Sequence, residues 1–170
     1  MKSLLALALT SGLGARAQAA DITLAVTIPR MDTAEYHRPY VAIWLEDGQK
    51  KIVQDIAVWY EQDKPQHEGR KWLKDLRQWW RVSGRNQEQP ADGVSGATRA
   101  VGVQTLKLAG QDKRLAKLPA GDYQLVVEAA REKGGRELVR LPLAWPPTHA
   151  ATQEASGAHE LGKIELRLNP

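Results

Sequence analysis

The chain has 170 residues, of which 26% are charged, a formal net charge of +4 and no cysteine. Without cysteine it can form neither disulfides nor thiolate metal sites, and it has no cysteine nucleophile. The basic excess is far smaller than a nucleic-acid-binding domain usually carries, which excludes that class of partner.

Residues 1–19 have the layout of an export signal. Lys2 gives a positive start, residues 4–9 form an apolar run, and residues 17–19 (Ala-Gln-Ala) match a small-x-small cleavage pattern. The apolar run is too short to remain in a bilayer as a spanning helix. We therefore expect cleavage near residue 19 and a single mature domain, residues 20–170, in the periplasm.

Apolar and polar residues alternate with a period of two in several later stretches, as in half-buried strands. Turn signals such as Asp47-Gly48 and Gly134-Gly135 separate these stretches. The predicted strands are residues 22–28, 41–46, 51–60, 101–108, 123–129, 139–143 and 164–168. Seven short strands with regular turns predict an all-β fold, an immunoglobulin-like antiparallel β-sandwich.

One segment departs from this pattern. Between residues 70 and 81, five apolar residues recur at helical spacing and charged residues occupy the opposite side. These apolar residues are Trp72, Leu73, Leu76, Trp79 and Trp80. The spacing predicts one amphipathic helix at 70–81, inserted into the sandwich and followed by a loop at 82–99. Residues 146–158, rich in Pro, Thr, Ala, Ser and Gly, predict another loop.

Residues 92–99 (DGVSGATR) are the most informative stretch of the chain. Gly93 and Gly96 permit backbone angles that residues with a Cβ resist. The composition predicts a polar loop that exposes the hydroxyls of Ser95 and Thr98. Taken alone, the local chemistry also fits an ordinary surface turn.

The same stretch resembles the acceptor motif of FAD:protein FMN transferase, Asp-x-x-Ser/Thr-Gly-Ala-Thr, which also occurs in flavin-bearing subunits of the sodium-translocating NADH:quinone reductase and Rnf complexes. The matching residues are Asp92, Ser95, Gly96, Ala97 and Thr98. The resemblance implies that this magnesium-dependent transferase splits FAD and links FMN through its phosphate to Thr98. It also implies that Asp92 is read as part of the motif.

Longer stretches resemble the predicted periplasmic proteins of domain-of-unknown-function family 2271. They are residues 38–47, Lys71-Trp72 with Asp75-Leu76 and Trp79, residues 92–99, and residues 121–132. That family lies near genes for the transferase and for membrane proteins with PepSY domains. The resemblance implies a periplasmic electron-transfer flavoprotein, which passes electrons between a PepSY-type membrane partner and an extracytoplasmic acceptor and has no turnover of its own.

Aromatic and basic side chains near the motif are candidates for flavin contact. Trp72, Trp79 and Trp80 could stack on the isoalloxazine ring or pack the helix on the sandwich, and for Trp79 and Trp80 the sequence leaves both roles open. A central place in the apolar stripe favours packing for Trp72 and Leu76. The candidates for pairing with the phosphate are Arg77, Arg81, Arg85 and Arg99, which could equally form a solvated face.

The remaining polar residues give weaker signals. The four histidines are scattered without ligand spacing and do not predict a metal site. No nucleophile–histidine–carboxylate arrangement follows from sequence spacing, because such triads are defined by geometry. The competing function is an unmodified immunoglobulin-like periplasmic module that binds a partner or ligand through its loops.

Overall fold

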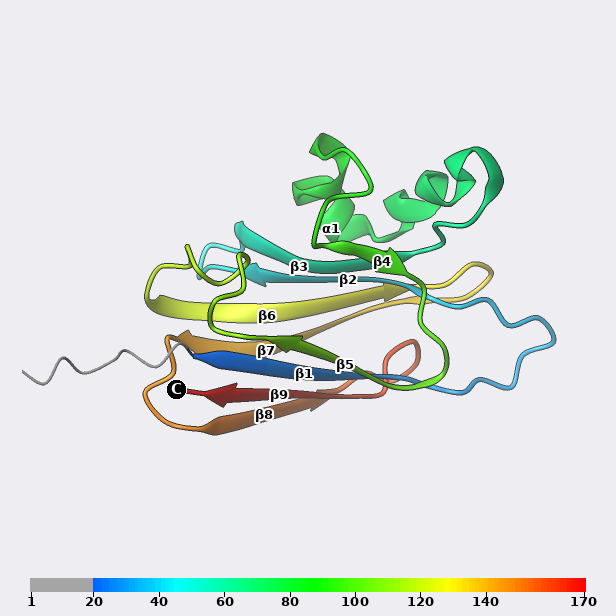
Figure 1. Ribbon diagram of the computed structural model, residues 1–170. Coiled ribbons are helices and arrows are strands. Elements are labelled where there is room, and N and C mark those ends of the chain that lie inside the picture. The colour runs from blue at the N-terminus through cyan, green and yellow to red at the C-terminus, as the bar shows by residue number, and fades with distance from the viewer. Residues whose placement is uncertain (1–19) are drawn as a thin grey trace, which may run out of the picture.

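The computed structural model describes residues 20–170, so the expected export signal lies outside the described residues. In that range, nine strands form two sheets that pack face to face (Figure 1). The strands are β1 (Asp21–Ile28), β2 (Tyr40–Glu46), β3 (Ile52–Tyr60), β4 (Ser95–Ala97), β5 (Gly102–Leu108), β6 (Gly121–Ala130), β7 (Arg136–Trp145), β8 (Ala151–Ser156) and β9 (Lys163–Asn169). One sheet has the order β5-β1-β9-β8 and the other β4-β3-β2-β6-β7. The predicted all-β sandwich is confirmed, while its immunoglobulin-like character stays a prediction.

The main core lies between the two sheets. The strand pattern of β1 is typical, because its inward residues are buried and the intervening ones are partly exposed. They meet aliphatic side chains from β2, β6, β7 and β9. Each fully buried aliphatic side chain contributes about 1.5–3 kcal/mol relative to an exposed one. This burial holds the sheets together.

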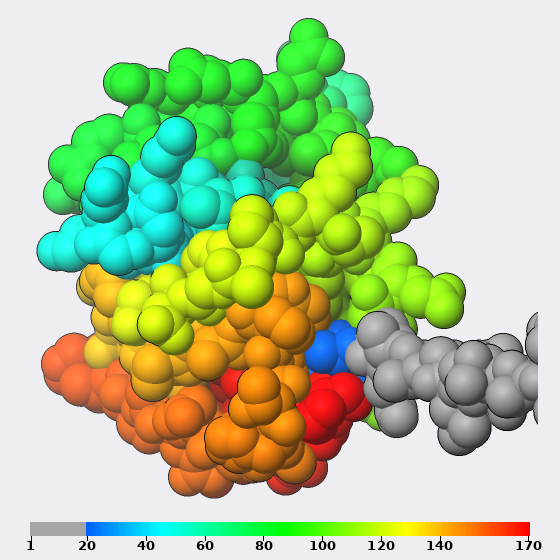
Figure 2. All heavy atoms as spheres, turned by 90° about the vertical axis from the view of Figure 1, so that its left-hand side faces the viewer, coloured from blue at the N-terminus to red at the C-terminus, as the bar shows by residue number. Residues whose placement is uncertain are grey.

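A second core covers the outer face of the five-stranded sheet. We call residues 61–94 the helical insertion; it contains η1 (Pro65–Asp75), α1 (Arg77–Val82) and η2 (Gly84–Asn86) and forms the uppermost layer of the molecule (Figures 1 and 2). Its apolar residues pack on the sheet in a cluster that we call the insertion core. The buried members are Tyr40, Ala42, Trp44, Val58, Tyr60, Leu73, Leu76, Trp79, Val126 and Ala130. As a result β2 is buried along its whole length, which explains its nearly continuous apolar sequence.

The helical insertion also sets the direction of the motif. The chain leaves the sheet at the end of β3, crosses its outer face and returns as β4 beside β3. β3 and β4 are parallel, with Val58 opposite Ser95 and Tyr60 opposite Ala97, whereas the other strand pairs are antiparallel. Parallel neighbours need a crossover of a dozen or more residues, and the helical insertion supplies it.

The prediction of one continuous α-helix over 70–81 is wrong. Residues up to 75 form a 3₁₀ helix, and the chain breaks at Leu76, whose ψ of 70° is not helical, before α1 begins. In a 3₁₀ helix residues three apart lie on one face. Leu73 in η1, Leu76 at the break and Trp79 in α1 are all buried, whereas Trp72, Lys74, Asp75 and Arg77 are exposed.

Two predicted loops contain strands. Residues 146–158 include β8, and the loop predicted at 82–99 includes β4. β8 is an edge strand with the sequence ATQEAS, in which half-buried and exposed residues alternate without an apolar face. Its hydrogen bonds come from β9. Neither strand has an apolar alternation that sequence analysis could detect.

Candidate functional site

The motif begins in a tight turn and ends at the rim of the sandwich. Gly93 has a φ of 70°, a conformation that favours glycine. The Val58 backbone N–H then donates to the Val94 carbonyl (2.9 Å), which joins the motif to β3. Thr98 is the first residue after β4, where the chain leaves the five-stranded sheet and descends to β5 of the other sheet (Figure 1). Thr98 therefore lies at the end of the sandwich, where the chain passes from one sheet to the other.

The two hydroxyls of the motif have different surroundings. Ser95 Oγ donates to Gln89 Oε1 (2.7 Å) and accepts the backbone N–H of Ala91 (2.9 Å). Its hydroxyl thus holds the loop together, contrary to the expectation that it is exposed. Among residues 20–170, no hydrogen bond engages the hydroxyl of Thr98, which is half-buried. Of the two motif hydroxyls, that of Thr98 is therefore the one without a hydrogen-bond partner in the described residues.

Thr98 lies in the wall of a hollow of about 270 Å³, which we call the Thr98 hollow. The other walls come from residues 36–40 before and at the start of β2, from Glu61 and Lys64 after β3, from η1, and from residues 130–132 at the end of β6. All of these segments meet at the end of the five-stranded sheet where β3, β4 and β6 end (Figure 1). Its size is near the lower limit of ordinary ligand pockets, about 300 Å³.

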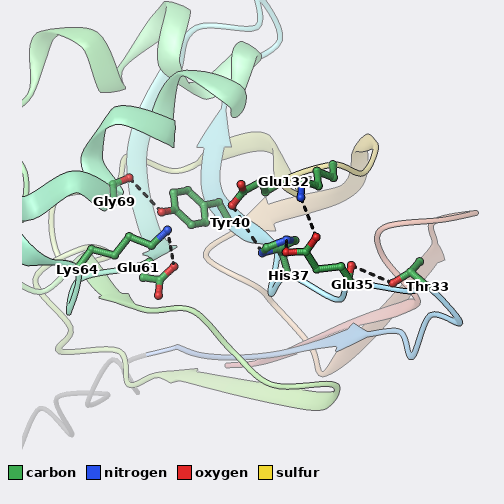
Figure 3. Close-up of polar contacts among 9 residues, drawn as sticks. Thr33, Glu35, His37, Tyr40, Glu61, Lys64, Gly69 and Glu132 are labelled. Carbon is green, nitrogen blue, oxygen red and sulfur yellow. Dashed lines mark hydrogen bonds and ion pairs between the residues drawn. The ribbon is translucent and has the colours of Figure 1, made fainter.

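Polar contacts fix the walls of the hollow (Figure 3). The Tyr40 hydroxyl donates to the Gly69 carbonyl (3.1 Å), and burial raises the pKa of Tyr40 to about 12. A Cβ on Gly69 would lie 1.8 Å from the Glu61 carbonyl oxygen, so only glycine allows η1 to approach this closely. Tyr40 and Gly69 thereby anchor η1 against β2.

One ion pair and the His37 side chain join the segment before β2 to the β6–β7 turn. His37 lies between two carboxylates, with Nε2 3.1 Å from Glu35 and Nδ1 3.6 Å from Glu132 (Figure 3). Lys133 Nζ lies 2.7 Å from Glu35, and both side chains are exposed. Hydrogen bonding to Lys133 holds the pKa of Glu35 below its usual range. Exposed pairs of this kind contribute little stability singly, so their main effect is to position one wall.

A second hollow, of about 440 Å³, lies on the other side of the motif. Asp92 and Ser95 line it together with His67 and Arg70, and Glu61 borders both hollows. Asp92 is exposed, and no hydrogen bond or ion pair of its side chain is found in the described part of the chain. The carboxylate of Asp92 is therefore available to another molecule.

The three tryptophans of the helical insertion differ in their exposure. Trp72 is 42% exposed and lines the Thr98 hollow, so the interpretation of Trp72 as a packing residue is wrong, while that of Leu76 is confirmed. Trp79 is fully buried and its indole N–H donates to Asp55 Oδ1 (2.8 Å), which favours packing over flavin contact. Trp80 is half-buried against the insertion core. Of the three, only Trp72 belongs to η1, in which Leu73 and not Trp72 takes the buried position.

The cations that line the Thr98 hollow are not the arginines that the sequence suggested for pairing with a phosphate. Arg38 and Lys64 line the hollow. Arg99 is exposed and its guanidinium lies 5.1 Å from the centre of the Trp59 ring, a cation–π contact. A Cβ on Gly96 would lie 3.3 Å from that same indole, so glycine suits the close approach of β4. Arg77, Arg81 and Arg85 are exposed on the helical insertion and do not border the hollow.

Two buried carboxylates hold the helical insertion in place. Glu128 of β6 is fully buried and accepts the backbone N–H groups of Gln78 (3.0 Å) and Trp79 (2.8 Å) at the start of α1. Asp55 of β3 accepts the Trp79 indole N–H and the Ser83 hydroxyl (2.6 Å). The apolar pattern gave no sign of either role, because alternation treats a charged strand residue as solvent-facing.

No group of three or more histidine or acidic side chains in residues 20–170 is arranged to hold a metal ion. Over the same residues, no helix is both long enough and apolar enough to cross a membrane.

Residues 21–163 match the family described as "Predicted periplasmic protein (DUF2271)". The chain belongs to this family. The description places the DUF2271 proteins in the periplasm and confirms the location predicted from residues 1–19. No curated protein and no solved structure matches the chain.

Proposed function

We propose that this DUF2271 protein is a periplasmic electron carrier with FMN attached to Thr98 through a phosphoester. A transferase would use FAD as the donor: the Thr98 oxygen attacks the phosphorus of the FMN half, the bond between the two phosphates breaks, AMP leaves and the hydroxyl proton passes to solvent. The observation that carries this proposal is the half-buried, free hydroxyl of Thr98 beside a hollow, next to a Ser95 hydroxyl that is already bound.

The residues around the hollow fit the attached group. Arg38 and Lys64 are the arginine and lysine in its lining, which also contains Glu61, Asp75 and Glu132, and Lys64 lies 3.5 Å from Glu61. A phosphate would replace part of this carboxylate pairing with charge-assisted hydrogen bonds, which are among the stronger polar contacts in proteins. When bound, the flavin supplies the electron-transfer chemistry, which side chains alone do not. The chain contributes binding, orientation and partial exclusion of water. A hollow near the lower limit of ligand pockets leaves part of a flavin accessible to redox partners.

The carboxylate of Asp92 supports recognition of the motif by a transferase. Asp92 is exposed in a turn, and its side chain makes no hydrogen bond or ion pair within residues 20–170. Its loss therefore costs the domain little, within about 0.5 kcal/mol for an ordinary surface site. We expect Asp92→Ala to impair flavin attachment while the domain stays folded.

The test is co-expression with the transferase and a supply of FAD, followed by intact mass and in-gel flavin fluorescence. The wild type should gain the mass of FMN less one water, and Thr98→Ala should gain none. Ser95→Ala is the matched control, since it removes the other hydroxyl and should remain modified. A wild type that stays unmodified, under conditions that label a known acceptor, would refute the proposal and favour the unmodified binding module.

We further propose that the electrons come from a PepSY-type membrane protein and pass to an extracytoplasmic acceptor. This follows from the family resemblance and the periplasmic location. The check is anaerobic mixing of the flavinylated protein with membranes that contain or lack the PepSY protein. Bleaching of the flavin absorbance only with the first membranes is the expected result.

A further inference from the structure

Trp72 is unusually exposed for a tryptophan side chain. It lies on the outward side of η1, is 42% exposed and borders the Thr98 hollow. Tryptophan has the largest flat face of any side chain and readily stacks on other aromatic rings. By contrast, the other two tryptophans of the helical insertion pack in the insertion core. The lining of the hollow therefore includes an exposed indole as well as Thr98, and Lys74 Nζ lies 6.0 Å from the centre of that indole.

A second feature is an unpaired polar atom that belongs to another residue in the lining of the hollow. The Tyr36 hydroxyl is buried, and within residues 20–170 it has no hydrogen-bond partner. A buried polar group left without a partner costs about 1–3 kcal/mol, so such a group calls for an explanation. Burial raises the pKa of Tyr36, so its hydroxyl keeps its proton and can donate. A ligand with a carbonyl at its edge would satisfy it.

We propose that the Thr98 hollow receives the isoalloxazine ring, with the Trp72 indole stacked on its face and the Tyr36 hydroxyl bonded to its polar edge. The inference rests on the proposed function and adds the residues that orient the ring. Isoalloxazine is a flat aromatic system with two carbonyls and an N–H along one edge, which matches an indole face and a phenol donor in one hollow. Arg38 and Lys64 also line the hollow, and a phosphate at Thr98 would compete with Glu61 for Lys64, whose Nζ lies 3.5 Å from that carboxylate.

Flavin fluorescence gives a direct test of the indole contact. An indole in van der Waals contact quenches the ring by donating one electron to its excited state, and that electron then returns. In flavinylated full-length protein, Trp72→Leu should therefore raise the fluorescence per attached flavin several-fold. Trp72→Tyr keeps an electron-rich ring and should retain much of the quenching. Trp80→Phe is the matched control, because Trp80 does not border the hollow, and should leave the fluorescence unchanged.

Tyr36→Phe tests the polar edge independently, because it removes one oxygen and keeps the ring. The expected result is a shift of the flavin absorption maximum with the attached mass unchanged. If the protein is flavinylated but neither Trp72→Leu nor Tyr36→Phe alters the flavin spectrum or fluorescence, the ring lies elsewhere and this inference fails alone. If no mass is gained at Thr98, the proposed function itself fails. Should Trp72→Leu not fold, accessibility of the wild-type flavin to iodide gives the second measurement, and full accessibility overturns the inference.

Discussion

Replacing Glu128 by alanine tests how the helical insertion is held on the sheet. The carboxylate is fully buried and accepts two backbone N–H groups of α1 and the Arg136 guanidinium (2.5 Å). The alanine variant leaves all three donors without this acceptor. We expect the first turn of α1 to loosen and the domain to lose stability.

The three donors contribute unequally to the expected loss. The Arg136 side chain is 37% exposed and can be solvated when Glu128 is removed, so the loss of its ion pair contributes less to the fall in stability. Gln78 is half-buried and its N–H can partly reach solvent, whereas Trp79 is fully buried and its N–H cannot. An unsatisfied buried donor costs about 1–3 kcal/mol. With a smaller share from the other donors, the free energy of unfolding should fall by about 2–4 kcal/mol.

Urea unfolding of residues 20–170, followed by tryptophan fluorescence, measures this loss by linear extrapolation. Glu128→Gln keeps one acceptor oxygen of the same shape and should cost less than Glu128→Ala. Glu154→Ala is the control, because Glu154 is half exposed and pairs only with Lys163, so it should stay within about 0.5 kcal/mol. The reasoning is refuted if Glu128→Ala behaves like the Glu154 control.

Three further predictions concern the walls and the stability of the domain. Gly69→Ala places a Cβ 1.8 Å from a backbone oxygen and should cost roughly 2–3 kcal/mol in urea unfolding; Gly48→Ala meets nothing within 4 Å, and an equal loss there would contradict this. Burial raises the pKa of Tyr40 from 10.0 to about 12. The unfolded chain therefore loses this proton first, so the free energy of unfolding should fall as pH rises through that range, and Tyr40→Phe should lack this alkaline slope. Burial raises the pKa of Glu137, but backbone N–H groups of residues 158–161 outweigh it and hold the pKa below 4.5. The unfolded chain then takes up the proton first, so stability should fall as pH drops below about 4.5, and an equally steep acid loss in Glu137→Gln would refute the assignment.

The strands could be predicted because the signal is local. In β1 and β9 the period of two survives from sequence to structure, since one face meets the core and the other meets water. The prediction of one helix is wrong because the chain breaks at Leu76, while Leu73, Leu76 and Trp79 are buried on both sides of the break. Glu128, fifty residues beyond Gln78 in the chain, accepts the first N–H groups of α1 and so helps to fix where this helix begins. The spacing of apolar residues within a segment cannot reveal a hydrogen-bond acceptor so distant in the sequence.

The same limit applies to the candidate site. The motif residues could be found because they are contiguous, and their resemblance to an acceptor sequence singles out Thr98. The hollow beside Thr98 could not be found, because Tyr36, Lys64 and Trp72 come from three segments that meet only at the end of the sheet. An apolar stripe on an α-helix predicts that Trp72 packs on the sheet. In the structure Trp72 lies in a 3₁₀ helix, and its side chain is exposed.

The topology explains why an acceptor threonine can lie at this point. The helical insertion must cross the outer face of the sheet to return parallel to β3, and in doing so it forms the insertion core and brings η1 beside the end of β4. Thr98 follows at the place where the chain changes sheets, so it has one wall from the sandwich and one from the insertion. Stability of the insertion and shape of the hollow are therefore coupled through Glu128 and Gly69. Partial loosening of the insertion should alter the environment of a group on Thr98 before the sandwich itself unfolds, since the main core does not depend on those contacts.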